Sequence, residues 1–279
     1  RFNHLNGQDV VAFAGSADTG LRIRSHENLL SQSVPVNIEA DSLNAAFLGD
    51  DVEPGSETWN LMVREVAREV TQKSGQKCTA VRRIFVPDSR RDAFVESFLE
   101  EVSSRVTGSP DDETVNMGPL ATADQLSSVL DGVNKLKEVA DVIHGNGERC
   151  DGVGAEAGKG YFFAPTILEA RDEGGADVIH DLEVFGPVST ICRYDGSAAS
   201  AACLNSRGAG TLVTSVYSDS DDWVHDFLRR GGSYSGRFYL GSEKMAPQAP
   251  GSGLALPSSL HGGPGRAGGG AELGGLRAL

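Results

Sequence analysis

Apolar runs, glycine turns and helical segments follow one another in a fixed order at the start of this chain. Residues 8–13 form a short apolar run, a turn with Gly15 and Gly20 leads into a helical stretch to about residue 30, and residues 33–40 form a second apolar run. Strand, glycine turn, helix and strand is the order of a parallel α/β unit, because parallel neighbours need a crossover connection. The chain is therefore predicted to adopt an α/β fold.

The same alternation continues along the rest of the sequence. The apolar positions of residues 59–70 repeat with helical spacing, Asp88 is a plausible cap for the helix that follows it, and Thr122 with Gln125 matches a capping box. A further short helix is expected over residues 220–230. Strands are expected at residues 83–86, 161–168, 188–193, 211–217 and 237–240.

Composition excludes several classes of protein. The 279 residues carry 25 Lys and Arg against 39 Asp and Glu, a net charge of −14, and no basic stripe offsets this excess, so nucleic acid is not expected as a partner. No apolar run approaches the ~18 residues that a membrane helix needs, and no secretory segment opens the chain. The four cysteines are far apart and form no Cys-x-x-Cys pair, which favours a reduced, cytoplasmic protein without a cysteine-based metal site.

Cys78 is the cysteine whose setting favours chemistry. It lies just past a helix end, in the polar turn Gly-Gln-Lys-Cys-Thr, and Lys77 is adjacent. A polar turn and a nearby cation favour the thiolate, which is the form that attacks a carbonyl carbon. The alternative is a small buried hydrophobic residue, and Cys150, Cys192 and Cys203 are interpreted in that structural way.

Glu39 is the candidate general base. It ends an otherwise apolar strand, and ligands of open α/β sheets bind beyond the carboxyl ends of the strands. A partly desolvated carboxylate at that position could activate water. An ordinary outward-facing strand carboxylate is the alternative.

Two further segments are weak signals when each is taken alone. Gly15, Ser16 and Gly20 lie between a strand and a helix, where backbone N–H groups could approach an anion, but a tight structural turn explains them equally well. Glu183 and Phe185 belong to Leu-Glu-Val-Phe-Gly-Pro-Val, which could be a plain entry into a strand.

The order of these four elements, taken together, resembles the aldehyde dehydrogenase superfamily over essentially the whole chain. The pair Gly-Gln-Lys-Cys at 75–78 and Glu-Val-Phe-Gly-Pro at 183–187 is the most specific part of the match, and the glycine-rich run at 262–268 resembles the C-terminal loop of the family. The resemblance implies Cys78 as nucleophile and Glu39 as base. It also implies Glu183 on the nicotinamide ribose with Phe185 beside it, and Gly15, Ser16 and Gly20 as cofactor-binding residues near the pyrophosphate.

The resemblance also implies a domain organisation. Residues 1–41 would be the C-terminal part of a Rossmann-type dinucleotide-binding domain, residues 42–260 an α/β catalytic domain, and residues 261–279 a truncated glycine-rich loop. We therefore expect the chain to be a piece of a longer protein. It would lack an asparagine of the oxyanion site and the residues that choose between NAD and NADP.

Finer details of the match favour the branch that acts in phenylacetate catabolism. There a dehydrogenase domain precedes a hydrolase domain and oxidises a CoA-linked semialdehyde. The dehydrogenases of benzoyl-CoA breakdown are an alternative within the family. The implied cofactor is NADP or NAD, with NADP slightly favoured, and the implied partners are a small aldehyde, further copies of the same subunit and a fused hydrolase. CoA-dependent acyl release and an inactive fragment of dehydrogenase ancestry are the alternative functions.

Overall fold

The computed structural model describes residues 2–254 and 261–270. Within these residues the backbone forms two sheets, a small parallel pair and a large sheet of seven strands. The strands are β1 (Val11–Ala14), β2 (Val36–Glu39), β3 (Ala45–Leu48), β4 (Arg83–Pro87), β5 (Ala140–His144), β6 (Thr166–Ala170), β7 (Val188–Tyr194), β8 (Thr211–Tyr217) and β9 (Ser235–Gly241).

Helices connect the strands and cover the large sheet on both faces. The helices are α1 (Ala17–Arg24), α2 (Glu27–Ser31), α3 (Glu57–Thr71), α4 (Arg91–Ser103), α5 (Ala123–Lys137), α6 (Asp177–Asp181), α7 (Ala198–Ser206) and α8 (Asp221–Gly231). Short 3₁₀ turns include η1 (Gln72–Gly75), η2 (Asp88–Arg90) and η5 (Gly265–Ala267). In the described part of the chain, no helix has both the length and the apolar character that a bilayer crossing requires.

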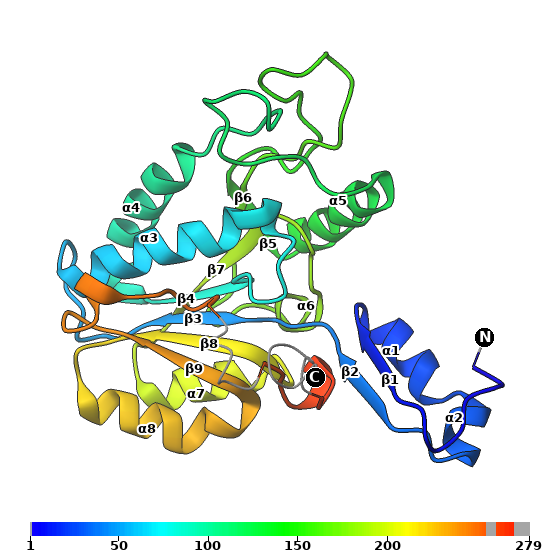
Figure 1. The fold of residues 1–279 in the computed structure, drawn as a ribbon. Helices are drawn as coiled ribbons and strands as arrows, with labels where there is room; N and C mark the ends of the chain where they lie inside the picture. Colours follow the sequence, from blue (N-terminus) through cyan, green and yellow to red (C-terminus); the bar gives the residue numbers. More distant parts are fainter. Residues whose placement is uncertain (1, 255–260, 271–279) are drawn as a thin grey trace.

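The large sheet has the strand order β5-β6-β7-β4-β3-β8-β9. Its neighbours are parallel except at one edge, where β5 runs antiparallel to β6. Side chains of α3 and α4 pack with one set of strand residues, while those of α5, α7 and α8 pack with the alternate set. Figure 1 shows this arrangement, with α3 on one side of the sheet and α7 and α8 on the other. Successive strand residues therefore belong to two different cores, as the two-residue period of a strand requires.

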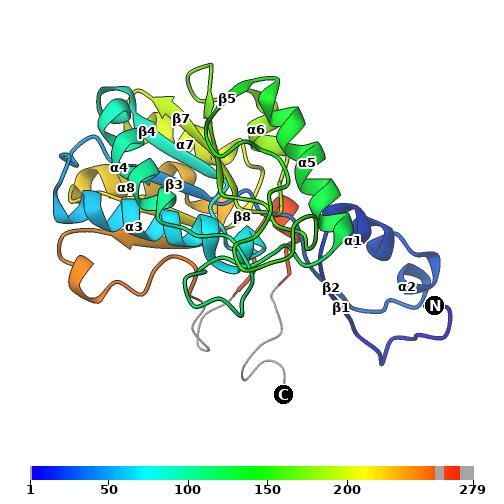
Figure 2. The ribbon, with the colours of Figure 1, turned by 90° about the horizontal axis from the view of Figure 1, so that it is seen from above.

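The N-terminal unit lies at one end of the large sheet (Figures 1 and 2). Its strands β1 and β2 pair in parallel, and α1 packs on β2. The glycine-rich segment 261–270 links this unit to the large sheet. The Ala40 amide donates to the Ala267 carbonyl, and a side chain on Gly236 or Gly263 would clash with the backbone facing it, at Gly262 and Thr211 respectively. The glycines thus allow a close approach of backbone to backbone.

Most predicted elements are present, and the differences have local causes. The predicted α/β architecture is present, and the Thr122 side chain caps α5 as predicted. The predicted helix before residue 30 is two helices, because the His26 side chain caps a new one. The strand predicted from residue 161 begins only after Pro165, which has no N–H for a sheet. The prediction that Asp88 caps the helix after it is wrong, because Asp88 lies in η2 and α4 begins at Arg91 without a side-chain cap.

Candidate active site

An unusual turn places Cys78 just before β4, at the amino ends of the parallel strands β3 and β4 of the large sheet. After α3, the residues Lys73, Ser74 and Gly75 have φ of 54°, 55° and 66°, a left-handed conformation that disfavours residues with a Cβ. The Ser74 hydroxyl stabilises the turn by donating to the carbonyl of Gly118. A Cβ on Gly75 would lie 2.1 Å from the carbonyl oxygen of Gly186, so only glycine fits at this position.

Arg82 joins the two motifs that contact each other at Gly75. Its buried guanidinium donates to the carbonyls of Gly75 and Gly186 at 2.8 and 2.7 Å. Each motif therefore provides a backbone acceptor for the same side chain. The specific pairing of these motifs in the sequence has a packing reason, because the cysteine turn and the Glu-Val-Phe-Gly-Pro turn hold each other in place.

Asn44 fixes the backbone on the other side of Cys78. Its amide nitrogen donates to the carbonyls of Cys78 and Ala80 at 2.8 and 3.0 Å, and its oxygen accepts from the Ser42 hydroxyl and the Val213 amide. The side chain is buried, so each of these bonds also satisfies a group that water does not reach. The segment that follows Glu39 in the sequence thus positions the thiol.

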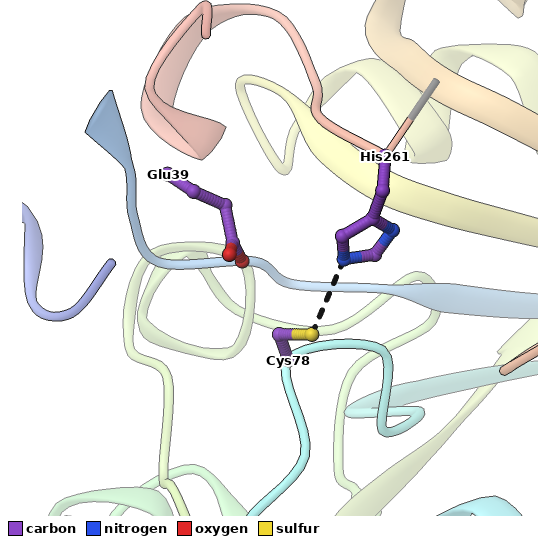
Figure 3. Close-up of side chains that lie close together, drawn as sticks. All are labelled: Glu39, Cys78 and His261. Atoms are coloured by element: carbon purple, nitrogen blue, oxygen red, sulfur yellow. Dashed lines mark hydrogen bonds between the residues drawn. The ribbon is translucent and has the colours of Figure 1, made fainter. Parts of the chain in front are cut away.

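Glu39, Cys78 and His261 converge at one point (Figure 3). One oxygen of Glu39, the sulfur of Cys78 and one ring nitrogen of His261 lie within 4.8 Å of one another. Glu39 is the last residue of β2, as predicted, and is only 6% exposed. The structure therefore brings together the two residues predicted for catalysis. It also adds His261, which the sequence analysis did not select.

His261 comes from the glycine-rich segment, 183 residues away from Cys78. Its Nε2 lies 3.3 Å from the sulfur of Cys78, and its Nδ1 lies 2.8 Å from a guanidinium nitrogen of Arg237 on β9. The only sequence signal was a histidine directly before a glycine run. A single histidine in a loop does not identify its partner, so this contact depends on the tertiary structure.

Lys77 does not have the role predicted for it. Its ammonium lies 2.7 Å from a carboxylate oxygen of Glu69 and donates to the side chain of Gln72. The cation is thus paired with a carboxylate. Adjacency in sequence suggested a charge beside the thiol, but in this turn the Lys77 side chain lies back along the end of α3, where Glu69 and Gln72 bind it.

The N-terminal turn has a clear structural role. Ser16 caps α1, and the Ala17 amide donates to the carboxylate of Asp41 at 2.9 Å. Gly20 is buried, and a Cβ there would lie 2.9 Å from the side chain of Ile38, so glycine allows α1 to pack on β2. Direct contacts of Gly15, Ser16 and Gly20 with a cofactor stay a prediction.

Glu183 lies close to the segment that follows Glu39. Its Oε2 accepts from the Ser42 amide, while Oε1 lies 3.5 Å from Nε of Arg82 and has no hydrogen-bond partner among the described residues. Burial raises the pKa of Glu183 to about 7, and the charge of Arg82 opposes that shift. Phe185 is partly exposed and lies under the Arg82 guanidinium, 5.4 Å from its ring centre. A buried acceptor without a partner fits a hydroxyl donor such as that of a ribose.

Comparison with known proteins agrees with this geometry. The model of the aldehyde dehydrogenase family matches residues 4–250. This chain belongs to the aldehyde dehydrogenase family. The family resemblance inferred from the motifs is thereby confirmed. The 3,4-dehydroadipyl-CoA semialdehyde dehydrogenase of Aromatoleum evansii is 37% identical over 94% of the chain and 51% of its own length.

Solved structures show the same aldehyde dehydrogenase fold. A putative aldehyde dehydrogenase from Burkholderia cenocepacia is 27% identical, with a TM-score of 0.79 over 94% of this chain and 49% of that one. A betaine aldehyde dehydrogenase from Staphylococcus aureus, solved with NAD⁺, is 22% identical, with a TM-score of 0.79 over 95% of this chain and 50% of that one. The chain spans about half the length of the curated relatives it matches.

Proposed function

We propose that the protein to which this chain belongs oxidises an aldehyde to a carboxylic acid with NAD or NADP, through a thioester on Cys78. The observation that supports this most directly is the convergence of the Cys78 thiol and the Glu39 carboxylate within 4.8 Å. Acyl-enzyme chemistry requires a nucleophile with a base close to it. The related semialdehyde dehydrogenase suggests a CoA-linked semialdehyde from aromatic-ring degradation as substrate.

The roles of the two side chains follow from their chemistry. Glu39 takes the thiol proton, and the sulfur of Cys78 attacks the aldehyde carbon, whose π electrons move onto the oxygen to give a thiohemiacetal. After oxidation of that carbon, the acyl group is a thioester on Cys78. Glu39 releases the thiol proton to solvent before the second half of the reaction. It then removes a proton from water, whose oxygen attacks the thioester; the C–S bond breaks, the carboxylic acid leaves, and the sulfur takes the proton from Glu39.

A nicotinamide cofactor would accept the hydride. Glu183 is the residue of this chain that fits it best, because the buried Oε1 can accept a hydrogen bond from a ribose hydroxyl. Phe185 would pack beside the same part of the cofactor. Gly15, Ser16 and Gly20 are assigned to the pyrophosphate end by the resemblance alone, and the Asp41 carboxylate already binds the first amide of α1.

Acyl release to CoA is the alternative outcome of the same intermediate. The buried Glu39 favours hydrolysis, because water needs a base and a CoA thiolate does not. A cytoplasmic location, assembly of several copies, a fused hydrolase and a preference for NADP are further parts of this proposal, and they rest on the family resemblance.

Substitution of the cysteines tests the proposal. We expect Cys78→Ala in the intact protein to abolish aldehyde oxidation, because Cys78 supplies the thiol that lies beside Glu39 among the described residues. Cys203→Ala is the matched control, since Cys203 is exposed on the surface and its loss should leave the rate unchanged. Cys192 should also be dispensable for chemistry, because burial raises the pKa of its thiol to about 12. Near-normal turnover in Cys78→Ala would refute the assignment.

A further inference from the structure

The side chain of Arg237 determines which atom donates the hydrogen bond between Cys78 and His261. Arg237 donates from Nη2 to the Ser252 carbonyl, and its Nη1 faces Nδ1 of His261 at 2.8 Å. A guanidinium has five N–H donors and no acceptor, so Nδ1 must accept. A neutral imidazole that accepts at Nδ1 has its proton on Nε2.

The proton on Nε2 lies between His261 and the sulfur of Cys78. The two atoms are 3.3 Å apart, a hydrogen-bond distance for sulfur, and His261 is only 8% exposed (Figure 3). In this tautomer His261 is a donor to Cys78 and has no lone pair with which to take the thiol proton. An imidazolium is disfavoured as well, since its Nδ1–H would face the N–H of Arg237.

We propose that His261 is a catalytic residue that donates a hydrogen bond from Nε2 to the sulfur of Cys78, and that Arg237 is the positioning residue that fixes the required tautomer. This inference rests on the proposed function in taking Cys78 as the nucleophile. The thiol proton goes to Glu39, the sulfur becomes a thiolate that accepts the His261 N–H, and His261 neither gains nor loses a proton. Hydrogen bonds to an ionised acceptor are stronger than those to a neutral one, so the donor favours the thiolate.

The same tautomer excludes two other roles for this cluster. A histidine base, as in Cys–His hydrolases, would need a free Nε2. A resident metal ion on Glu39, Cys78 and His261 would need the Nε2 lone pair as well, and its ligand histidine would then carry a proton on Nδ1. That proton would point at the Arg237 guanidinium, which cannot accept it.

The pH dependence of Cys78 alkylation tests the donor without substrate or cofactor. In the intact protein, the rate of iodoacetamide modification is followed at the Cys78 peptide by mass spectrometry. We expect the midpoint of this rate to lie one to two pH units higher in His261→Phe than in the wild type, and aldehyde oxidation at neutral pH to fall about 10- to 100-fold. His261→Gln retains an N–H donor, so its midpoint should rise by no more than half as much as that of His261→Phe. His225→Gln on the surface of α8 is the control and should change nothing.

Substitution of Arg237 tests the tautomer. In Arg237→Met, His261 is free to place its proton on Nδ1, so the alkylation midpoint should rise and Arg237→Lys should restore it. Zn²⁺ should protect Cys78 from alkylation at a tenfold lower concentration in Arg237→Met than in the wild type, because the Nε2 lone pair becomes available to a metal. Arg229→Met, at an exposed arginine of α8, controls for the loss of a positive charge.

Each outcome is decisive. An unchanged midpoint in folded His261→Phe, or in Arg237→Met if His261→Phe fails to fold, would overturn the donor role. Equal protection by Zn²⁺ in Arg237→Met and wild type would overturn the role of Arg237. Failure of the proposed function is a separate result: aldehyde oxidation would persist in Cys78→Ala, whatever the alkylation profiles show.

Discussion

At the scale of single residues, a thiol, a carboxylate and an imidazole meet at the site, and each is expected to have a different role. Cys78 supplies a thiol, Glu39 a buried carboxylate, and the Nε2–H of His261 faces the sulfur. Because Arg237 makes His261 a donor, only Glu39 remains in this cluster to accept a proton. The base for hydrolysis of the thioester is therefore expected to be Glu39.

Replacement of Glu39 by Gln should separate the two halves of the reaction. The amide cannot activate water, so thioester hydrolysis should slow by about 10²- to 10⁴-fold, while hydride transfer slows less. Rapid-mixing kinetics of the intact protein should show a burst of reduced cofactor followed by a slow steady state. Loss of the burst while Cys78 still reacts with a thiol reagent would mean that Glu39 acts before hydride transfer.

At the scale of elements, two turns from distant parts of the chain form one unit. The turn before Cys78 and the turn before β7 meet at Gly75 and Gly186, and Arg82 binds both carbonyls. Glu183 lies beside Arg82 at 3.5 Å, and burial raises its pKa to about 7 from an ordinary value of 4.5. The folded protein therefore retains a proton on Glu183 in a pH range in which the unfolded chain has lost it.

This raised pKa predicts how stability changes with pH. The folded state binds the extra proton between pH 4.5 and about 7, so the free energy of unfolding should fall across this range as pH rises. The slope from one group is at most about 1.4 kcal/mol per pH unit. In Glu183→Gln this contribution is absent. As pH rises to about 7, the free energy of unfolding of the variant should therefore increase relative to that of the wild type, and above pH 7 the difference should stay constant.

Chemical unfolding of the intact protein at several pH values measures this difference. Glu148→Gln, at an exposed position, is the control and should follow the wild type at every pH. A difference between Glu183→Gln and the wild type that does not depend on pH would contradict the raised pKa of Glu183.

At the scale of the whole molecule, the two sheets differ in how fully helices cover their faces. The large sheet has helices on both faces, whereas β1 and β2 form a parallel pair with α1 on one side. Parallel sheets are normally covered on both faces. Val10, Leu21 and Leu30 of the small unit are more than 60% exposed, which is apolar surface that further strands or helices would cover.

We therefore expect a polypeptide of these 279 residues alone to fold around Cys78 but to oxidise no aldehyde. The resemblance places part of the cofactor site and one oxyanion donor outside these residues, and such a donor contributes about 2.7–4 kcal/mol in other enzymes. Calorimetry with millimolar NAD or NADP should detect no binding, while Cys78 still reacts with a thiol reagent. Turnover by the purified polypeptide would show that enough of the cofactor site lies within it.

The sequence by itself determined the fold class and the family, and it selected Glu39 and Cys78 as a candidate pair whose side chains the structure brings together. The fold class depends on local signals: the Thr122 cap, the helical spacing of α3 and the strand-forming residues of β8 all act between neighbours in the chain. The family and the candidate pair depend on short motifs, which are also local. Among the elements that were not predicted, which also include β5 and α6, β3 and α7 lack such a signal. The strand is only four residues long and buried throughout, and the helix is rich in small residues without a polar face of regular spacing.

Only the tertiary structure decided which charged and polar groups surround the thiol. Lys77, adjacent to Cys78 in sequence, pairs with Glu69, while His261 reaches the sulfur from the other end of the chain. Side-chain direction and long-range packing set these contacts, and neither can be inferred from spacing along the sequence. The close backbone approaches at Gly236 and Gly263 bring the His261 segment against β9 and β8 respectively, and this packing places a donor beside Cys78.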